Sequence, residues 1–366
     1  MRKFRIIISG GGTGGHIFPA LAIARSLEEK IKNIDILFVG AKGKMEMNKI
    51  PLEGYKIEGL PILGLQRRFT LKNFLFPFRV IISLLRARKI INNYKPDIVI
   101  GTGGYASGPI LYYAAIIGTP SLVQEQNSFA GITNRILSKV VDRICVAYDN
   151  MDRFFPKRKI VFTGNPIRRD ILNFNNKREL AINHFNLDAN KKTVLVIGGS
   201  LGARTINQVI DNNINFFEKY NLNLIWQTGI GYNKRAMASV HNKLKGINAY
   251  TFIKDMDLAY AAADIIVSRA GAIAVSELCC IGKPTILIPS PNVSEDHQTK
   301  NAQAIVNKNA AMLVKDNEAD AKLVNCLKSI IKDSNLANEL SGNIKNLAVI
   351  DAADNIVNNV IELLEI

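Results

Sequence analysis

Twice along this chain, a short apolar segment runs directly into a glycine-rich turn. Residues 4–9 are followed by GGGTGG at 10–15, and residues 193–197 are followed by GGSLG at 198–202. A strand that leads into a glycine-rich turn and then into a helix is typical of the start of a Rossmann-type domain. Two such starts within 366 residues predict an α/β protein with two Rossmann-like domains.

Apolar segments alternate with helical patterns along most of the length. Strands are expected at Phe4–Ser9, Ile34–Val39, Asp97–Ile100, Ser121–Val123, Arg143–Ala147, Thr193–Ile197, Leu222–Gln227, Ala249–Phe252, Asp264–Ser268 and Thr285–Pro289. These segments are continuously apolar, which is typical of a parallel sheet covered on both faces. A helix is expected at Ile17–Lys30, where apolar residues recur at helical spacing. We therefore predict a doubly wound parallel sheet in each domain.

The boundary between the domains is expected at Thr163-Gly164-Asn165-Pro166, a segment that interrupts any regular element. This places an N-terminal domain at 1–163 and a C-terminal domain at 164–347. The last segment, about 348–366, has a rather apolar helical pattern. It is a candidate to pack back on the first domain, although periodicity alone does not show this.

The charge balance favours a polyanionic partner. The 47 Lys and Arg against 31 Asp and Glu give a net charge of +16, which suits nucleic acid, a phosphorylated ligand or an anionic membrane. The four cysteines show no CxxC spacing, so neither a disulfide scaffold nor a zinc ribbon is expected, and a reducing cytoplasm is the default.

Residues 98–124 carry no charge, over a length that could span a membrane. Glycines and prolines interrupt this run, however, and predict strand, loop, helix and strand instead. Any membrane contact is therefore expected to be peripheral.

The first glycine loop fits the GxGxxG pattern of dinucleotide-binding proteins through Gly10, Gly12 and Gly15. A NAD site also needs an acidic residue near the end of the second strand, and none follows until Glu46. No glycine loop continues as a Walker motif. Together with Gly101–Tyr105, the turns at 10–15 and 198–202 make three glycine-rich loops, each directly after an expected strand. They could be tight turns only, but together with the positive charge they favour a phosphorylated ligand.

The segment 268–277, SRAGAIAVSE, follows an apolar strand. Gly271 and the small residues after it would let a helix N-terminus approach a diphosphate closely. Glu277 would then be placed to accept both hydroxyls of a ribose, although a solvated helix glutamate is the more ordinary alternative.

No metal site is predicted. Asp255-Met256-Asp257 resembles the Asp-x-Asp that holds a divalent cation in some sugar-nucleotide enzymes. It lies between a strand and a helix, so a helix N-cap is the preferred interpretation. No HExxH motif, Cys/His cluster or GxSxG motif is present.

Residues 59–96 contain no Asp or Glu, and basic residues there alternate with large apolar ones. This pattern, strongest at about 67–89, suits an anionic membrane surface. RNA binding would use similar residues, but no RNP or KH-like signature accompanies them, and no nucleic-acid partner is predicted. An ordinary crossover helix with one core face is the simpler alternative, and one helix can combine core and lipid faces.

Six motifs occur in an order that is far more specific than any one of them. They are GGGTGGHIFPA (10–20), GTGGYASGP (101–109), EQNSFAGITN (125–134), GNPIR (164–168), GGSLGAR (198–204) and SRAGAIAVSE (268–277). Together, over about residues 4–302, they resemble the MurG family of peptidoglycan synthesis.

The resemblance implies the GT-B fold, in which two Rossmann-like, doubly wound domains face each other across a cleft. It implies inverting transfer of N-acetylglucosamine from UDP-N-acetylglucosamine to the C4 hydroxyl of undecaprenyl-diphospho-muramoyl-pentapeptide, without a cofactor. The expected location is the cytoplasmic face of the bacterial cell membrane, with peripheral attachment.

The resemblance also implies roles for individual residues. Ile253 would present backbone groups to the uracil of the donor. Ala272, Ile273, Ala274, Val275 and Ser276 would form the helix start at the donor, and Glu277 would accept from the ribose. Ser200 and Arg168 would lie near the diphosphate, and Gln298 would contact the hydroxyls of the sugar. From the first domain, Thr13, Gly14, Gly15 and Asn127 would meet the donor sugar. The acceptor diphosphate would lie over the first-domain glycine loops, near Gly103, Gly104, Tyr105 and Glu125. His297 stands where the family is expected to have the first of two glutamines.

His16 is the candidate general base. It follows the first glycine loop, where its imidazole would face the ligand, and an imidazole exchanges protons near neutral pH. Glu125 is the rival base, and His16 could instead donate a hydrogen bond to the acceptor diphosphate. The alternatives to the whole assignment are a UDP-sugar transferase acting on another lipid, a sugar-nucleotide epimerase and, from another class, a nicotinamide-dependent oxidoreductase.

Overall fold

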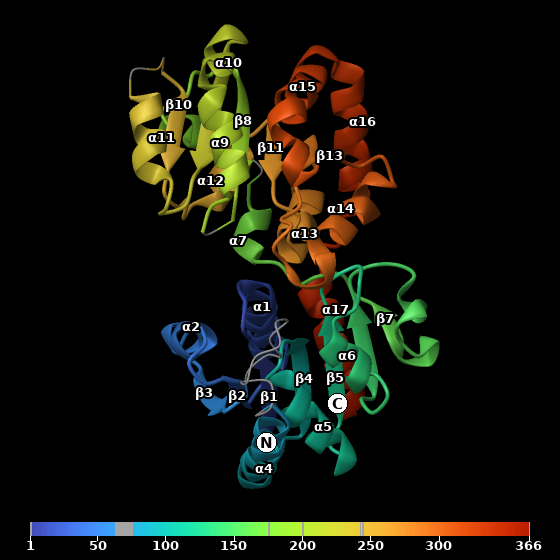
Figure 1. The fold of residues 1–366 in the computed structure, drawn as a ribbon. Helices are drawn as coiled ribbons and strands as arrows, with labels where there is room; N and C mark the ends of the chain where they lie inside the picture. The colour runs from blue at the N-terminus through green and yellow to red at the C-terminus, as the bar shows by residue number, and fades with distance from the viewer. Residues whose placement is uncertain are drawn as a thin grey trace. The chain divides into compact units, whose positions relative to one another are not determined.

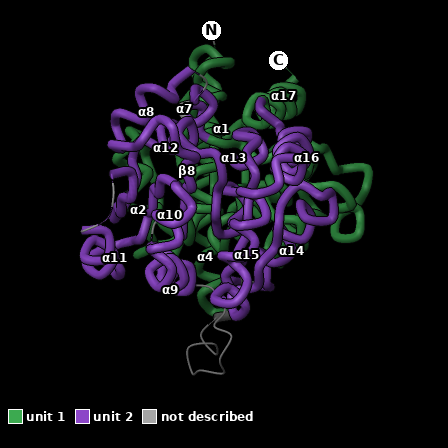
Figure 2. The backbone as a smooth tube through the Cα atoms, turned by 90° about the horizontal axis from the view of Figure 1, so that it is seen from above, with its two compact units in different colours: residues 1–167, 351–366 green, residues 168–350 purple. Residues whose placement is uncertain are grey.

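The computed structural model describes residues 2–62, 76–174, 176–199, 201–241, 243 and 245–365. The chain divides into two compact units, residues 1–167 with 351–366, and residues 168–350 (Figure 2). The division falls four residues after the expected boundary, since Asn165 is bonded within the first unit: it donates to the Gln126 carbonyl oxygen and accepts from Gln124. Both units are α/β, as the strand pattern predicts.

The first unit is built on a parallel sheet of seven strands, in the order β3-β2-β1-β4-β5-β6-β7 (Figure 1). The strands are β1 (Phe4–Gly10), β2 (Ile34–Ala41), β3 (Lys56–Leu60), β4 (Ile98–Gly103), β5 (Ser121–Glu125), β6 (Arg143–Val146) and β7 (Ile160–Phe162). The uncharged run 98–124 forms β4, a helix and β5, which confirms its predicted interruption. No described helix is long and apolar enough to cross a membrane.

Helices cover both faces of this sheet. They are α1 (Gly14–Lys30), α2 (Glu46–Leu52), α4 (Phe76–Tyr94), α5 (Ser107–Ile116), α6 (Ile132–Leu137) and α17 (Ala352–Leu364), with short 3₁₀ turns at Met151–Arg153 and Lys157–Lys159. Alternate β1 residues point to opposite faces: Ile7 packs with α4 and α5, whereas Ile6 and Ile8 pack with α1 and α17. Continuously apolar strands are therefore required, because neither face of the sheet meets water.

The C-terminal helix α17 belongs to the first unit. Its Ile356, Val357 and Val360 are fully buried in the core on the α1 side of the sheet. Ser26 on α1 donates a hydrogen bond to Asp354 at 2.6 Å. The expected terminal helix thus lies against α1, and it begins a few residues later than about 348.

The second unit repeats the plan with six parallel strands, in the order β10-β9-β8-β11-β12-β13. The strands are β8 (Lys192–Ile197), β9 (Leu222–Gln227), β10 (Ile247–Tyr250), β11 (Ile265–Ser268), β12 (Thr285–Leu287) and β13 (Met312–Leu313). The helices are α7 (Arg169–Leu172), α8 (Arg178–His184), α9 (Arg204–Asn212), α10 (Ile214–Lys219), α11 (Asn233–Val240), α12 (Met256–Ala262), α13 (Ala272–Ile281), α14 (His297–Val306), α15 (Ala319–Lys332) and α16 (Ser334–Lys345), with 3₁₀ turns at Ser294–Asp296 and Asp316–Glu318.

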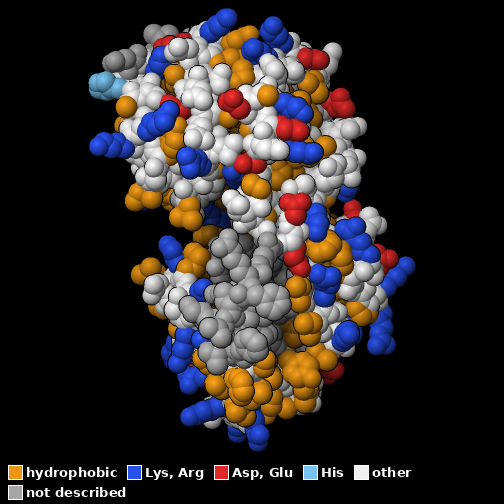
Figure 3. All heavy atoms as spheres, viewed as in Figure 1, with side chains coloured by type: hydrophobic (Ala, Val, Ile, Leu, Met, Phe, Trp, Pro, Cys, Tyr) orange, Lys and Arg blue, Asp and Glu red, His pale blue; other side chains and the backbone are white. Residues whose placement is uncertain are grey.

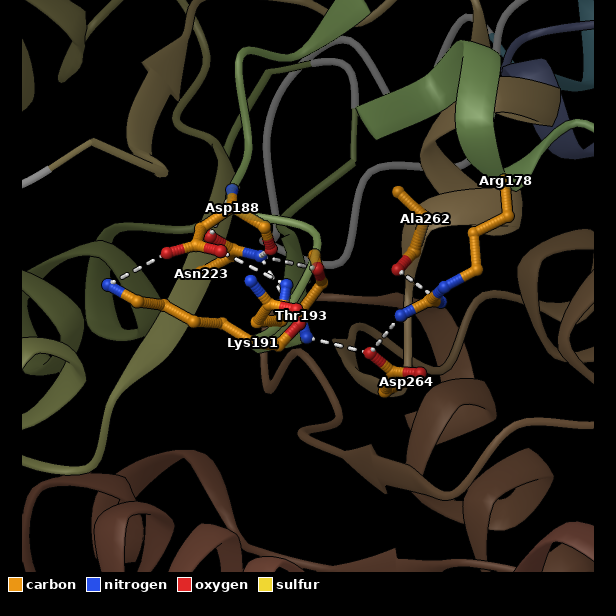
Figure 4. A network of polar contacts seen from close by, with 8 residues as sticks. Arg178, Asp188, Lys191, Thr193, Asn223, Ala262 and Asp264 are labelled. Atoms are coloured by element: carbon orange, nitrogen blue, oxygen red, sulfur yellow. Dashed lines mark hydrogen bonds and ion pairs between the residues drawn. The ribbon is translucent and has the colours of Figure 1, made fainter. Parts of the chain in front are cut away.

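A polar network holds the amino ends of the central strands of the second unit (Figure 4). The Asp264 carboxylate accepts from the Thr193 N–H at 2.8 Å and from Arg178 at 3.0 Å, and Arg178 also donates to the Ala262 carbonyl oxygen. These bonds attach the start of α8 to β8 and to the turn before β11. They fix the end of the sheet opposite the glycine-rich turns.

In both sheets the strand order reverses beside the strand that precedes a glycine-rich turn. The first reversal lies between β1 and β4, and the second between β8 and β11. In open α/β sheets, ligands bind beyond the carboxyl ends of the strands at this switch point. Each unit therefore presents one candidate site.

Candidate functional site

The switch point of the first unit brings the first and third glycine loops into contact. Gly10 is the register partner of Gly103. A Cβ on Gly104 would lie only 2.4 Å from the Gly11 carbonyl oxygen, and Gly104 has φ of +84°. Glycine is therefore required here both for backbone conformation and for the close approach of the two loops. Tyr105 follows directly and is exposed.

The first turn of α1 lies at the edge of this pair of loops. Thr13 occupies the N-cap position, and Gly14, Gly15 and His16 form the start of the helix. Thr13 and Gly15 are exposed. The first N–H groups of a helix have no partner within it and attract anions, so this turn can receive an oxygen-rich ligand.

His16 is held in one orientation by two acceptors. Its Nδ1 lies 2.9 Å from the Thr102 carbonyl oxygen and 3.1 Å from Gln126 Oε1. A carbonyl oxygen only accepts, so Nδ1 carries the hydrogen, and Nε2 of the neutral ring holds the lone pair. The buried Gln126 also donates to the Thr102 carbonyl oxygen at 2.7 Å. Nε2 is thus the nitrogen that can take up a proton.

Glu125, the rival base, is buried at the end of β5, and its carboxylate accepts several hydrogen bonds. Oε1 accepts from the Asn127 N–H and amide at 3.0 and 3.2 Å. Oε2 accepts from the Gly131 N–H and the Asn134 amide at 3.0 and 2.9 Å. A carboxylate with these partners organises the loop that carries Asn127, and this arrangement favours His16 as the base.

Glu46 has a role in this site that the sequence analysis missed. Its side chain is fully buried, and it accepts from the Gly12 N–H and from the Ala41 N–H, each at 2.9 Å. A Cβ on Gly11 or Gly40 would lie within 2.5 Å of Glu46 atoms, so glycine makes room for it. The carboxylate fixes the first loop and uses one of the N–H groups that a dinucleotide phosphate would need.

The switch point of the second unit is formed by the loops after β8 and β11. Gly271 occupies the N-cap position of α13, and the segment Ala272–Ser276 makes its first turns, as the sequence predicts. The side chains there are small, and that of Ser276 donates back to the Ala272 carbonyl oxygen at 3.1 Å. The start of this helix can therefore approach an anion closely. Ser200, in the loop after β8, lies outside the described residues.

Glu277 lies farther along α13 and is half-buried. The hydroxyl of Tyr260 on α12 lies 3.2 Å from its Oε2. Burial first, and then the Glu277 charge, raise the pKa of Tyr260 well above 10, while the Arg168 charge acts in the opposite direction. Arg168, Tyr260 and Glu277 are thus neighbours, although Tyr260 carried no signal beyond its place in an apolar helix.

Ile253 and Gln298, two further residues that the sequence analysis assigned to the donor, each use one polar group in a hydrogen bond within the protein. The Ile253 N–H donates to the buried Gln227 Oε1 at 2.9 Å. Gln298 Oε1 accepts from the Ser290 N–H at 2.9 Å and from the Ala270 N–H at 3.3 Å. The atoms of these two groups that the contacts do not use are the Ile253 carbonyl oxygen and the Gln298 amide nitrogen. His297 Nε2 lies 3.3 Å from Glu295.

The Asp255-Met256-Asp257 segment is arranged as a helix start. Asp255 holds the N-cap position of α12, although its side chain makes no capping bond. Asp257 forms an ion pair with Lys177 at 2.7 Å. Burial opposes ionisation of Asp257, but hydrogen bonds from Lys177 and the backbone outweigh it and lower its pKa. Across the part of the chain that the structure describes, no group of three His, Cys, Asp or Glu side chains could hold a metal ion.

Two family models match most of the chain. They are the glycosyltransferase family 28 N-terminal domain, over residues 6–146, and the glycosyltransferase family 28 C-terminal domain, over residues 193–356. Each match contains one of the two switch points.

Curated relatives match over the full length. A protein of Flavobacterium psychrophilum is 52% identical over 100% of this chain and 99% of its own, and one of Parabacteroides distasonis is 50% identical over 100% of both. Both are named UDP-N-acetylglucosamine--N-acetylmuramyl-(pentapeptide) pyrophosphoryl-undecaprenol N-acetylglucosamine transferase.

Solved structures share the architecture. The crystal structure of Acinetobacter baumannii MurG matches with a TM-score of 0.78 and 27% identity, over 99% of this chain and 100% of that one. A UDP-N-acetylglucosamine 2-epimerase matches with a TM-score of 0.66 and 13% identity, over 99% and 96%. At that identity the second likeness concerns the fold alone.

Proposed function

Since the chain belongs to glycosyltransferase family 28, we propose that it performs the reaction for which its full-length relatives are named. It is a glycosyltransferase with the GT-B fold that transfers N-acetylglucosamine from UDP-N-acetylglucosamine to undecaprenyl-diphospho-muramoyl-pentapeptide, in peptidoglycan synthesis. The observation that carries the proposal is full-length identity of about half, with the family's motifs at both switch points.

We assign the donor mainly to the second unit. The Ile253 carbonyl oxygen would accept from the uracil N3–H, and Glu277 would accept from the ribose hydroxyls. The first turns of α13 and Arg168 would face the diphosphate, where their positive potential stabilises the leaving UDP. The resemblance also assigns Ser200 to the diphosphate, but this residue lies outside those that the structure describes. Gln298 would donate to a hydroxyl of the sugar. Thr13, Gly14, Gly15 and Asn127 of the first unit would contact the same sugar.

The acceptor is assigned to the first unit. Its diphosphate would lie against the loop of Gly103, Gly104 and Tyr105, beside the first glycine loop. The buried Glu125 supports this surface through the loop of Asn127. Since Glu46 already holds the Gly12 N–H, the first loop is poorly suited to the pyrophosphate of a dinucleotide, which counts against the oxidoreductase alternative.

In the proposed mechanism, His16 Nε2 removes the proton from the muramoyl C4 hydroxyl. The oxygen attacks the anomeric carbon, a C–O bond forms, and the bond to the diphosphate breaks from the opposite side, so the configuration inverts. The electron pair leaves with UDP, and the proton stays on the imidazole. Because Thr102 and Gln126 hold Nδ1–H, the resulting imidazolium is stabilised by two acceptors.

We further propose that the first unit docks on the cytoplasmic face of the membrane through α4 and α5. On α4, Phe78, Ile81, Ile82 and Leu85 are exposed, whereas Ala87, Ile90 and Ile91 are buried in the core. On the adjacent α5, Tyr112 and Ile116 are exposed, as is Ile117 directly after the helix. Figure 3 shows apolar side chains gathered at this end of the unit, with basic ones around them.

This surface has the chemistry of a peripheral lipid contact. Along α4 the exposed apolar stripe continues into Arg88 and Lys89, which are also exposed. Apolar side chains can enter the acyl boundary while basic ones meet anionic headgroups, each contributing about 1 kcal/mol. Residues 67–75 of the predicted stretch lie outside the described residues.

Calorimetric titration tests the ligand class. UDP-N-acetylglucosamine and UDP should bind to the protein, and Glu277→Gln should weaken both. NADH should not compete with UDP. Tighter binding of NADH than of UDP-N-acetylglucosamine would contradict the proposal.

A further inference from the structure

The carboxylate assigned to the ribose has a buried partner behind it. Tyr260, on α12, is 1% exposed, and its hydroxyl oxygen is 3.2 Å from Glu277 Oε2. A carboxylate only accepts, so the tyrosine hydroxyl is the donor. The raised pKa of Tyr260 keeps this hydroxyl protonated throughout the physiological range. The contact therefore joins a rigid, buried donor to a half-exposed acceptor.

Glu277 needs such a partner if its carboxylate is to accept hydrogen bonds from two ribose hydroxyls. A glutamate has three side-chain torsions, and ordering a long side chain costs conformational entropy. A vicinal diol is bound well only when both carboxylate oxygens are held in the plane that meets it. Tyr260 restricts one oxygen from behind, while α7, next to Arg168, packs on both α12 and α13. The carboxylate is thus oriented before any donor arrives.

We propose that Tyr260 is a positioning residue that holds Glu277 for the ribose hydroxyls and thereby makes the donor site selective for ribonucleotides. The inference rests on the proposed function, because it takes Glu277 as the ribose acceptor. When a deoxyribose binds, one hydroxyl is missing, and a fixed carboxylate is left with an unsatisfied oxygen. A carboxylate that lacks the bond from Tyr260 is held less firmly, so the penalty for the missing hydroxyl becomes smaller.

The test compares kcat/KM for UDP-N-acetylglucosamine with kcat/KM for its 2′-deoxyribose and 3′-deoxyribose analogues. Tyr260→Phe should lower the value for the natural donor about tenfold, mainly through KM, as expected for loss of a hydrogen bond to a charged group. It should lower the values for the analogues much less, so that the preference for the natural donor falls severalfold. This ratio does not depend on the folded fraction of the sample, because unfolded protein scales all three values equally.

Tyr232→Phe is the matched control. Tyr232, at the N-cap position of α11, also donates to a carboxylate, that of Asp211 on α9, at 2.7 Å. This variant should keep the wild-type preference among the three donors. An equal loss for all three donors in Tyr260→Phe, or no loss, would overturn the positioning role.

Glu277→Gln separates the inference from the function on which it rests. It should reduce the preference for the natural donor at least as much as Tyr260→Phe does. If Glu277→Gln reduces the preference and Tyr260→Phe does not, only the inference fails. If Glu277→Gln leaves the preference unchanged, the ribose assignment is wrong, and the role of Tyr260 falls with it.

Discussion

At the scale of single residues, the side chains that we assign to the ligands in the two units are held by buried polar partners. Gln126 and the Thr102 carbonyl oxygen hold His16, and Tyr260 contacts Glu277. The sequence could indicate His16 and Glu277, because each follows a small-residue turn after an apolar strand. It could not indicate that Gln126 meets His16 from 110 positions away, since that contact depends on the register of β1, β4 and β5.

Replacement of His16 by Ala should lower kcat by about 10²–10⁴-fold, because general-base catalysis contributes that much. The affinity for UDP-N-acetylglucosamine should change little. The pH–rate profile should also change, because the group that takes up the proton is absent. Steady-state kinetics over pH 5–9 with both substrates varied measure these effects.

Glu125→Gln is the informative comparison. The substituted amide has one acceptor oxygen in place of two, so it can keep either the two bonds from Asn127 or the bonds from Gly131 and Asn134, but not both pairs. The free energy of unfolding should fall by about 1–3 kcal/mol, while the pH–rate profile stays as in the wild type. Near-normal turnover and an unchanged profile in His16→Ala would transfer the role of base to Glu125.

At the scale of helices and strands, the central strands were predictable, and three of the four edge strands were not. All ten expected strands are present, with Ala249–Phe252 found slightly earlier as β10. The three that the sequence analysis missed, β3, β7 and β13, are edge strands. An edge strand is covered less completely, so it is short and carries charges, as Lys56 and Glu58 do in β3. Its apolar pattern is therefore weak.

The start of α13 should replace a metal ion at the donor diphosphate. Its N-terminal N–H groups and Arg168 supply the positive potential that a divalent cation provides in other nucleotide-sugar enzymes. Turnover should therefore be nearly unchanged in excess EDTA. A loss of activity in EDTA that magnesium or manganese restores would revive Asp255 and Asp257 as metal ligands.

The exposed face of α4 should be required for turnover on a membrane-bound acceptor and not for the transfer reaction itself. Replacement of Phe78, Ile82 and Leu85 by Ser should release the protein from vesicles of phosphatidylglycerol and phosphatidylethanolamine. It should also lower turnover on a long-chain acceptor. Turnover on a short, water-soluble acceptor should persist, because the buried face of α4 is unaltered. Flotation and kinetics on both acceptors give the measurement.

In the control variant, three exposed apolar residues outside α4 are replaced in the same way: Leu52, Leu180 and Met237. This variant should float with the vesicles as the wild type does. Arg86 is left unchanged because it pairs with Glu58 at 3.5 Å. An equal loss on both acceptors would mean that the stripe on α4 is structural only.

At the scale of the whole molecule, the chain crosses between its two units twice, near residues 167 and 350. The sequence predicted two domains from the repeated strand-and-glycine start. It could not place the second crossing firmly, because the periodicity of a helix shows that it has an apolar face and not which core that face joins. The structure shows that α17 completes the first core beside α1.

Ile356→Ala should destabilise the first unit. Ile356 is fully buried on α17, and loss of such a side chain costs about 2–5 kcal/mol. Chemical unfolding should show the loss, while UDP affinity should remain close to that of the wild type, because the donor is assigned to the second unit. A large loss of UDP affinity in the folded variant would contradict the assignment of the donor to the second unit.

Transfer of labelled sugar measures the assigned activity most directly. The protein is incubated with UDP-N-acetylglucosamine labelled in the sugar and with undecaprenyl-diphospho-muramoyl-pentapeptide. Label should appear in a lipid-extractable disaccharide with a β linkage to the muramoyl C4 oxygen, with one UDP released for each sugar transferred. Absence of label from the lipid while the labelled donor is epimerised, or transfer of label only to a different lipid, would contradict the assignment.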